Sequence, residues 1–199
     1  MRTSIAGKRA QLVEAATVLL HRQGLQRTTL AEVAERARIP LGNVYYYFRT
    51  KEALAEAVIE AHLAALERIF QGWEEVHPDP RDRLRALVRM PLAEAQQILD
   101  FGCPHGSLCQ ELDKLGARSA LARAGARLLG LYLRWTERQF QALGQGAEAA
   151  PLARDLVASL QGTLLLAHAM RSRTLLKERL LRLEQSLTVL SPPRKRSRS

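Results

Sequence analysis

Three of the four tyrosines and the single asparagine of this 199-residue chain lie within five consecutive positions, residues 43–47. Tyrosine hydroxyls and an asparagine amide can donate hydrogen bonds to phosphate oxygens, and their edges can contact base edges in a groove of DNA. Gly42, which precedes them, lets a partner approach the backbone closely. The alternative is an aromatic cluster in the core of a three-helix domain, but three adjacent helical residues span about 200° and cannot all face one core. The pattern therefore favours a surface that contacts nucleic acid.

A helix that would position this surface is predicted to begin at Thr29. The Thr29 hydroxyl can cap it, and Glu32, three residues on, can accept a hydrogen bond from the amide of the cap residue. Pro40 disfavours helical geometry in the residue before it, so this helix should end near Ile39. Apolar side chains recur at the i, i+3, i+4 and i+7 spacing of one helical face, at Leu30, Val33, Ala34 and Ala37.

A second short helix is predicted to begin at Pro40, whose missing N–H costs nothing in a first turn. Val44 and Phe48 lie four residues apart and should face the core, which leaves the tyrosines for the other faces. Thr50 should cap the next helix, where Lys51 adds a positive charge beside a helix N-terminus, a combination that favours phosphate. Two short helices joined by a tight turn are typical of the helix-turn-helix DNA-binding motif.

The segments GLQRTT, residues 24–29, and GNVYYYFRTKEAL, residues 42–54, resemble the DNA-binding domain of TetR-family transcriptional regulators. The resemblance covers roughly residues 8–55. Pro40 stands where the family often has a serine or threonine cap. The resemblance implies phosphate contacts from Thr28, Thr29, Tyr45, Tyr47 and Lys51, base edges nearest Leu41, Gly42 and Asn43, and Tyr46 on the same surface.

The resemblance also implies an all-α fold with an N-terminal three-helix helix-turn-helix domain, residues 1–50, and a helical C-terminal ligand-binding and dimerisation domain, residues 51–190. Repression of an operator by a homodimer, relieved by a small-molecule effector, is the usual function of such proteins. The resemblance further implies a central effector cavity in the C-terminal domain. The side chains expected to line it are Trp73, Phe101, His105, Leu108, Trp135 and His168. Each could equally be a core residue, and a lone histidine on an apolar helix, such as His168, is more often one.

The net charge of +10 is concentrated at two places. Residues 1–51 carry nine basic and three acidic side chains, residues 191–199 carry four basic and none acidic, and residues 52–190 carry seventeen of each. A basic N-terminal domain is the electrostatic footprint expected for phosphate binding. A membrane surface is the competing partner, but these charges lack a strongly apolar amphipathic face. Residues 191–199 are expected to be a basic disordered tail, either solubilising or attracting phosphates non-specifically.

The composition is rich in alanine, leucine, glutamate and arginine, which favours helices. The apolar patterns and breaks along the chain divide it into about nine of them. No apolar run approaches the eighteen residues or so that a membrane span needs, and no signal peptide is evident at the N-terminus. We therefore expect a cytoplasmic protein without a membrane partner. The other helices are predicted at residues 8–23, 51–72, 81–99, 106–115, 117–143, 151–170 and 174–190.

Apolar stripes mark three of these helices. The 51–72 helix is predicted to bury one face, and it is long enough to join two domains. The last two helices carry leucines at four-residue and three-residue steps, which could pair two subunits as a four-helix bundle or face their own subunit's core. We favour pairing, because a helix-turn-helix monomer contacts too few bases for useful specificity. The stripes consist of Leu54, Val58, Ala61, Ala65 and Ile69, then Leu152, Leu156, Leu160 and Leu164, then Leu176, Leu180, Leu183 and Leu187.

Cys103, His105 and Cys109 lie close together and raise the questions of a metal site and a thiol switch. Zinc would need a fourth ligand, and six positions along a helix separate two cysteine backbones by about 9 Å, too far for a disulfide. Ordinary packing is the expected role. No nucleophile motif, phosphate loop or carboxylate pair is found, so we expect no enzyme, no catalytic residue, no metal and no cofactor. A basic architectural DNA-binding protein without an effector is the alternative to a repressor.

Overall fold

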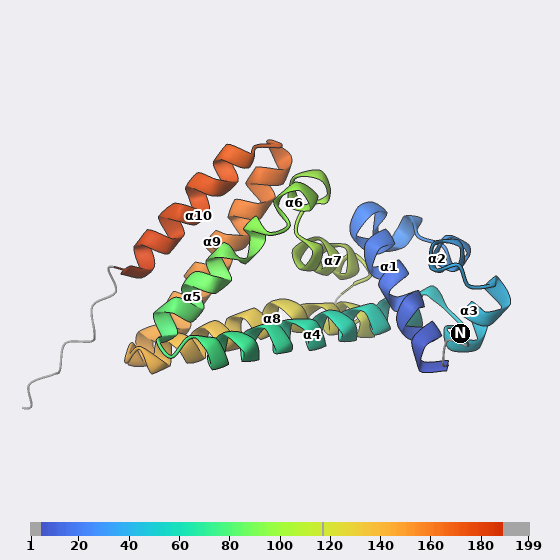
Figure 1. Ribbon diagram of the computed structural model, residues 1–199, viewed down its shortest axis with the longest axis horizontal. Helices are drawn as coiled ribbons and strands as arrows, with labels where there is room; N and C mark the ends of the chain where they lie inside the picture. Colours follow the sequence, from blue (N-terminus) through green and yellow to red (C-terminus); the bar gives the residue numbers. More distant parts are fainter. Residues whose placement is uncertain (1–4, 117, 189–199) are drawn as a thin grey trace, which may run out of the picture. The chain divides into compact units, whose positions relative to one another are not determined.

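The computed structural model describes residues 5–116 and 118–188, and every regular element in those ranges is helical (Figure 1). The all-α prediction is confirmed. Among these residues, no helix combines the length and the apolar character that crossing a bilayer requires. The elements are α1 (Ile5–Arg27), α2 (Leu30–Ala37), α3 (Leu41–Tyr47), α4 (Lys51–Val76), α5 (Pro80–Arg89), η1 (Met90–Leu92), α6 (Ala95–Phe101), α7 (Pro104–Asp113), α8 (Ala120–Ala142), η2 (Gly146–Glu148), α9 (Ala149–Ala169) and α10 (Arg173–Thr188).

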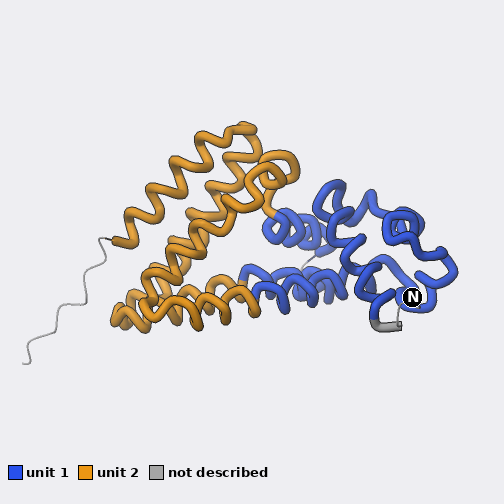
Figure 2. The backbone as a smooth tube through the Cα atoms, in the orientation of Figure 1, with its two compact units in different colours: residues 1–66, 104–129 blue, residues 67–103, 130–199 orange. Residues whose placement is uncertain are grey.

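The chain divides into two compact units, shown in different colours in Figure 2. Unit 1 contains residues 1–66 and 104–129, and unit 2 contains residues 67–103 and 130–199. The helices α4 and α8 contribute residues to both. Unit 1 thus holds the predicted helix-turn-helix domain together with the first part of α4, α7 and the first part of α8. The functional boundary expected at residue 50 stays a prediction, and the tail expected at residues 191–199 lies outside the described residues.

Unit 1 is built on α1, which packs against α2 and α7, while α2 packs against α3. Leu12, Val13, Ala16 and Leu20 of α1 are buried, and Val44 and Phe48 are buried as their spacing predicted. Gly24 interrupts α1 with a backbone conformation, φ 80° and ψ 169°, that a residue with a side chain rarely adopts. The capping box predicted for Thr29 and Glu32 is present at the start of α2.

Unit 2 has α10 packed on α9, α5 and α6, and α9 packed on α6. Six of the eight leucines in the stripes of α9 and α10 are buried, while Leu152 and Leu183 are partly exposed. The prediction that the stripes pair two subunits is therefore wrong, because packing within one subunit already removes most of these leucines from water. The buried members are Leu156, Leu160, Leu164, Leu176, Leu180 and Leu187.

Two other helix predictions differ from the structure. The helix expected over residues 81–99 is divided into α5 and α6, because Pro91 lies in the short 3₁₀ turn η1 between them and cannot continue the α-helical hydrogen bonds. In α4 the buried face differs from the expected stripe, since Ala61 and Ile69 are exposed. The residues buried in that part of α4 are instead Ile59, Leu63, Leu66 and Phe70.

Candidate nucleic-acid interface

The α1–α2 turn, residues 24–29, comprises the last residues of α1 after its kink at Gly24 and the two residues before α2. Side chains that bind its backbone hold this turn. The Thr29 hydroxyl accepts from the amide of Glu32 at 3.2 Å, and the Glu32 carboxylate accepts from the amide of Thr29 at 2.8 Å. Hydrogen bonds from the Thr29 side chain and amide stabilise the charged form and lower the pKa of the Glu32 carboxyl. These contacts hold the start of α2 in one geometry.

Thr28 has a different role from the phosphate contact that the resemblance implies. Its side chain is buried, and its hydroxyl donates to the carbonyl of Gly24 at 2.7 Å. A hydroxyl that is engaged inside the turn does not face a partner. We therefore correct the assignment of Thr28, which stabilises the turn, and we leave it out of the proposed interface.

The helix α3 presents its polar and aromatic side chains to solvent. Tyr45 is 52% exposed and Tyr46 is 75% exposed, whereas Val44 on the opposite side is fully buried. Tyr47 is partly buried, and its ring meets that of Tyr46 edge to face at 5.0 Å. Asn43 is also partly buried. The separation of one core residue from three tyrosines agrees with the geometric reasoning that these rings cannot share a core.

Gly42 is exposed, and a Cβ built at this position would meet nothing within 4 Å. Its backbone is not in the left-handed region that favours glycine. Because glycine weakens a helix relative to alanine, nothing within the free protein explains its presence in the first turn of α3. A partner that approaches the backbone closely at this point would explain it.

The first turn of α4 supplies the adjoining part of this surface. The Thr50 hydroxyl accepts from the amide of Ala53 at 3.1 Å and so caps the helix as predicted. The Lys51 ammonium donates to the carbonyl of Gln26 at 3.0 Å. An ammonium has three N–H donors, so this contact leaves donors for a phosphate. The proposed interface thus consists of the exposed residues Thr29, Leu41, Gly42, Tyr45 and Tyr46 and the partly buried residues Asn43, Tyr47 and Lys51.

Replacing Gly42 by Ala should change stability and DNA binding in opposite directions. Helix propensity favours alanine by up to about 1 kcal/mol, so the melting temperature should rise. The added methyl would lie between α3 and DNA, so affinity for a duplex selected from a random pool should fall by about tenfold, which corresponds to about 1.4 kcal/mol. Thermal unfolding and fluorescence anisotropy measure the two effects, and unchanged affinity would contradict a close approach at Gly42.

The six side chains predicted to line an effector cavity are divided between the two units. In unit 2, Trp135 is fully buried, and its ring lies 5.7 Å from that of Trp73. Nδ1 of His168 lies 2.9 Å from the carbonyl of Leu99, to which it can donate. The structure places Trp73, Trp135, Phe101 and His168 in unit 2, and His105 and Leu108 in unit 1.

Three residues that contact these candidate side chains were not predicted from the sequence. Phe70 stacks on Trp135 with ring centroids 4.4 Å apart, and Glu74 accepts from the Trp135 indole at 2.8 Å. In unit 1, Nδ1 of His62 lies 3.1 Å from Nε2 of His105. Burial is the main effect that lowers the pKa of His62 to about 4 and that of His105 to about 3, and the charge of nearby histidines lowers both further. His62 and His105 lie 43 residues apart, so no local spacing marks them as partners.

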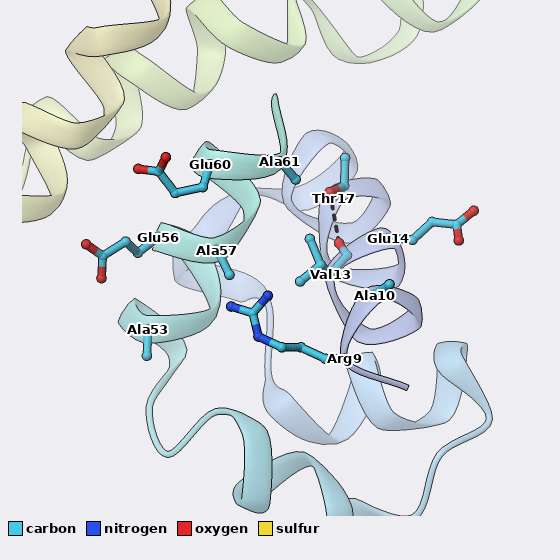
Figure 3. A pocket seen from close by; sticks show the side chains of 10 residues that line it. All are labelled: Arg9, Ala10, Val13, Glu14, Thr17, Ala53, Glu56, Ala57, Glu60 and Ala61. Carbon is cyan, nitrogen blue, oxygen red and sulfur yellow. Dashed lines mark hydrogen bonds between the residues drawn. The ribbon is translucent and has the colours of Figure 1, made fainter. Parts of the chain in front are cut away.

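A groove of about 590 Å³ lies between α1 and α4 in unit 1 (Figure 3). In this view the carboxylates of Glu56 and Glu60 point away from Val13 and Ala57, whereas the Arg9 guanidinium reaches in between α1 and α4. None of the six candidates for effector binding lines it. The residues that do are Arg9, Ala10, Val13, Glu14, Thr17, Ala53, Glu56, Ala57, Glu60 and Ala61.

The capped α2, the exposed face of α3 and the N-terminus of α4 together define a helix-turn-helix DNA-binding protein. Residues 12–58 match the family described as "Bacterial regulatory proteins, tetR family". The HTH-type transcriptional regulator BetI of Burkholderia ambifaria is 32% identical over 157 residues, covering 64% of this chain and 81% of the relative. The chain therefore belongs to the TetR family; it is a DNA-binding transcriptional regulator and not an enzyme.

Solved structures share the fold over most of the chain. A regulatory protein TetR from Rhodobacter sphaeroides is 26% identical with a TM-score of 0.75, covering 89% of this chain and 97% of its own. A TetR transcriptional regulator from Legionella pneumophila is 18% identical with a TM-score of 0.80, covering 94% and 99%. At that lower identity the likeness concerns the fold alone.

Proposed function

We propose that this chain is a cytoplasmic homodimeric repressor that binds a palindromic operator and is released from it by a small-molecule effector. The observation that carries the DNA-binding part is the exposed face of α3, with Gly42 facing open space beside two exposed tyrosines. A single α3 contacts few base pairs, so useful specificity requires two copies on two half-sites. We propose residues 1–50 as the DNA-binding domain and residues 51–190 as the domain for effector binding and dimerisation.

An apolar surface on α9 supports the dimer. Residues 156–170 contain no charged side chain, although part of this segment faces water. Leu165 is 56%, Leu166 51% and Met170 67% exposed, and Gly162 adds open space beside the backbone. Exposed apolar patches without charge mark protein interfaces. A second copy of α9 would cover these side chains, and the same surface would serve both subunits of a two-fold dimer.

Replacing both Leu166 and Met170 by Glu should convert the dimer to a monomer, because four like charges would then meet at the two-fold axis. Operator affinity should fall by about a hundredfold or more, since each half-site would be bound separately. Sedimentation and operator titration measure the two effects. Val76→Glu is a matched control, because Val76 is equally apolar and 70% exposed but lies on α4. A double variant that stays dimeric would contradict this interface.

Effector binding is proposed for residues 51–190, where the candidates are Trp73, Phe101, His105, Leu108, Trp135 and His168. A compound that binds there and releases operator must bind the free protein more tightly than the operator complex. By linkage, the operator should lower the affinity for the compound by the same factor, and a tenfold effect corresponds to about 1.4 kcal/mol. A compound found by thermal-shift screening should be titrated with and without operator. Equal affinities would show that its site is not coupled to DNA.

The second candidate function is an architectural DNA-binding protein without an effector. The basic charge of residues 1–51 favours non-specific phosphate contacts in either case. The two functions differ in specificity, because a repressor should prefer its operator over random duplex by roughly a thousandfold or more. The exposed Gly42 in the first turn of α3 supports the repressor, since a close approach of the helix to base edges calls for a small residue there, whereas phosphate contacts alone do not.

A further inference from the structure

The carboxylate of Glu111 on α7 binds the backbone of the last residues of α1, just after the kink at Gly24, within the α1–α2 turn. Oε2 of Glu111 accepts from the amide of Leu25 at 2.8 Å, and Oε1 accepts from the amide of Gln26 at 2.9 Å. These residues lie 86 and 85 positions from Glu111 in the chain. Both oxygens of one carboxylate are therefore used on two consecutive amides, which is a strong, charge-assisted arrangement.

Gly24 makes this approach possible. A Cβ at position 24 would lie 2.8 Å and 2.9 Å from the two oxygens of Glu111, closer than carbon and oxygen atoms approach. The positive φ of 80° at Gly24 turns the following amides toward the carboxylate. The glycine of the GLQRTT segment thus serves the α7 contact as well as the end of the helix.

The same turn holds Lys51. The backbone N–H of Gln26 donates to Glu111, and the carbonyl of the same residue accepts from the Lys51 ammonium at 3.0 Å. Thr29, at the end of the turn, is held separately by Glu32. A chain of hydrogen bonds therefore runs from α7, through the backbone of Leu25 and Gln26, to the first turn of α4.

We propose that Glu111 is a positioning residue for DNA binding: it holds the α1–α2 turn so that the Gln26 carbonyl presents Lys51 to a phosphate. Glu111 itself does not contact DNA. The proposal rests on the assignment of Lys51 as a phosphate contact. Through these hydrogen bonds, α7 would fix the position of the DNA-binding helices within unit 1.

The sign of the effect separates positioning from simple electrostatics. Glu111→Gln removes a negative charge from the DNA-binding unit, and loss of a negative charge by itself strengthens binding to phosphates. A glutamine also offers one acceptor and one donor group where two acceptors are needed, so one of the two amides loses its partner. Positioning by Glu111 therefore predicts weaker binding despite the more favourable charge.

The experiment compares Glu111→Gln with Asp113→Asn, a matched charge change two residues away on the exposed part of α7. The probe is a labelled duplex of about 30 base pairs, long enough for two half-sites, selected by the wild-type protein from a random pool. We expect about tenfold weaker binding for Glu111→Gln and equal or slightly stronger binding for Asp113→Asn. Salt titration should show a slope smaller by about one unit per half-site for both Glu111→Gln and Lys51→Ala. The double variant Glu111→Gln/Lys51→Ala should bind little more weakly than Lys51→Ala, because both changes remove one phosphate contact.

Two outcomes distinguish a failure of the positioning role of Glu111 from a failure of the assignment of Lys51 as a phosphate contact. If Lys51→Ala leaves affinity and salt slope unchanged, the proposed interface is wrong and the positioning role with it. If Lys51→Ala weakens binding while Glu111→Gln matches Asp113→Asn, the interface stands and the positioning role is overturned. Amide hydrogen exchange provides a second measurement, which does not require the variant to fold. In the wild type the amides of Leu25 and Gln26 should be protected, and exchange at the rate of an open loop would overturn the proposal.

Discussion

Acidification from pH 6.5 to pH 4 should destabilise the protein through its buried histidine pair, His62 and His105. The two rings meet edge to face with centroids 4.7 Å apart, and one nitrogen of each lies 3.1 Å from the other. One nitrogen must donate and the other accept, so this contact requires at least one neutral ring. Burial is the main reason that the pKa values are lowered to about 4 and about 3, and the charge of His21 also contributes.

The sign follows from proton binding in the two states. Between pH 6.5 and 4 the unfolded chain binds protons at both histidines while the folded protein does not, so stability falls as the pH falls. Each such histidine costs about 1.4 kcal/mol per pH unit, which for His62 alone amounts to about 3 kcal/mol across this range. Urea unfolding at several pH values measures the free energy of unfolding.

The variants that test this pair are His62→Leu/His105→Leu and His77→Gln. The first removes both titrating rings and should flatten the slope of stability between pH 6.5 and 4, while acidic groups continue to titrate. The second removes a histidine outside the pair and should keep the wild-type slope. A wild-type slope in the double variant would show that the pair does not cause the acid sensitivity.

Trp135→Ala should lower the free energy of unfolding by about 3–5 kcal/mol, the usual range for a buried tryptophan. Trp135 is fully buried, stacks on Phe70 at 4.4 Å with an interplanar angle of 16°, and donates its indole N–H to Glu74. Trp135→Phe keeps the stacking ring and loses the hydrogen bond, so it should cost only about 1–2 kcal/mol. Urea unfolding of the two variants provides the comparison.

The stability of Trp135→Ala also distinguishes a core role of Trp135 from a role in effector binding. A tryptophan that mainly contacts an effector would leave the unfolding free energy nearly unchanged when it is replaced. Trp73, which is partly buried on α4, offers the matched comparison, because Trp73→Ala should cost less than Trp135→Ala. Equal stability of Trp135→Ala and the wild type would show that this side chain is not part of the core of unit 2.

The sequence by itself determined the helix-turn-helix motif. The capping box of Thr29 and Glu32, the break at Gly24, and the opposite directions of Val44 and the neighbouring tyrosines all depend on residues within about one helical turn of each other. Local spacing decides such features, so they could be predicted with their residue numbers. The concentration of basic charge in residues 1–51 likewise needed no structure.

Only the tertiary structure decided which apolar faces pack within the subunit and which polar groups meet. The leucine stripes of α9 and α10 have the spacing of an interface, but these two helices pack on each other and on α5 and α6. The exposed patch lies instead at Leu165, Leu166 and Met170. The contacts of Glu111 with the α1–α2 turn and of His62 with His105 span 85, 86 and 43 residues. Periodicity shows that a helix has an apolar face, but it does not show which other helix covers that face, because this depends on how all helices pack together.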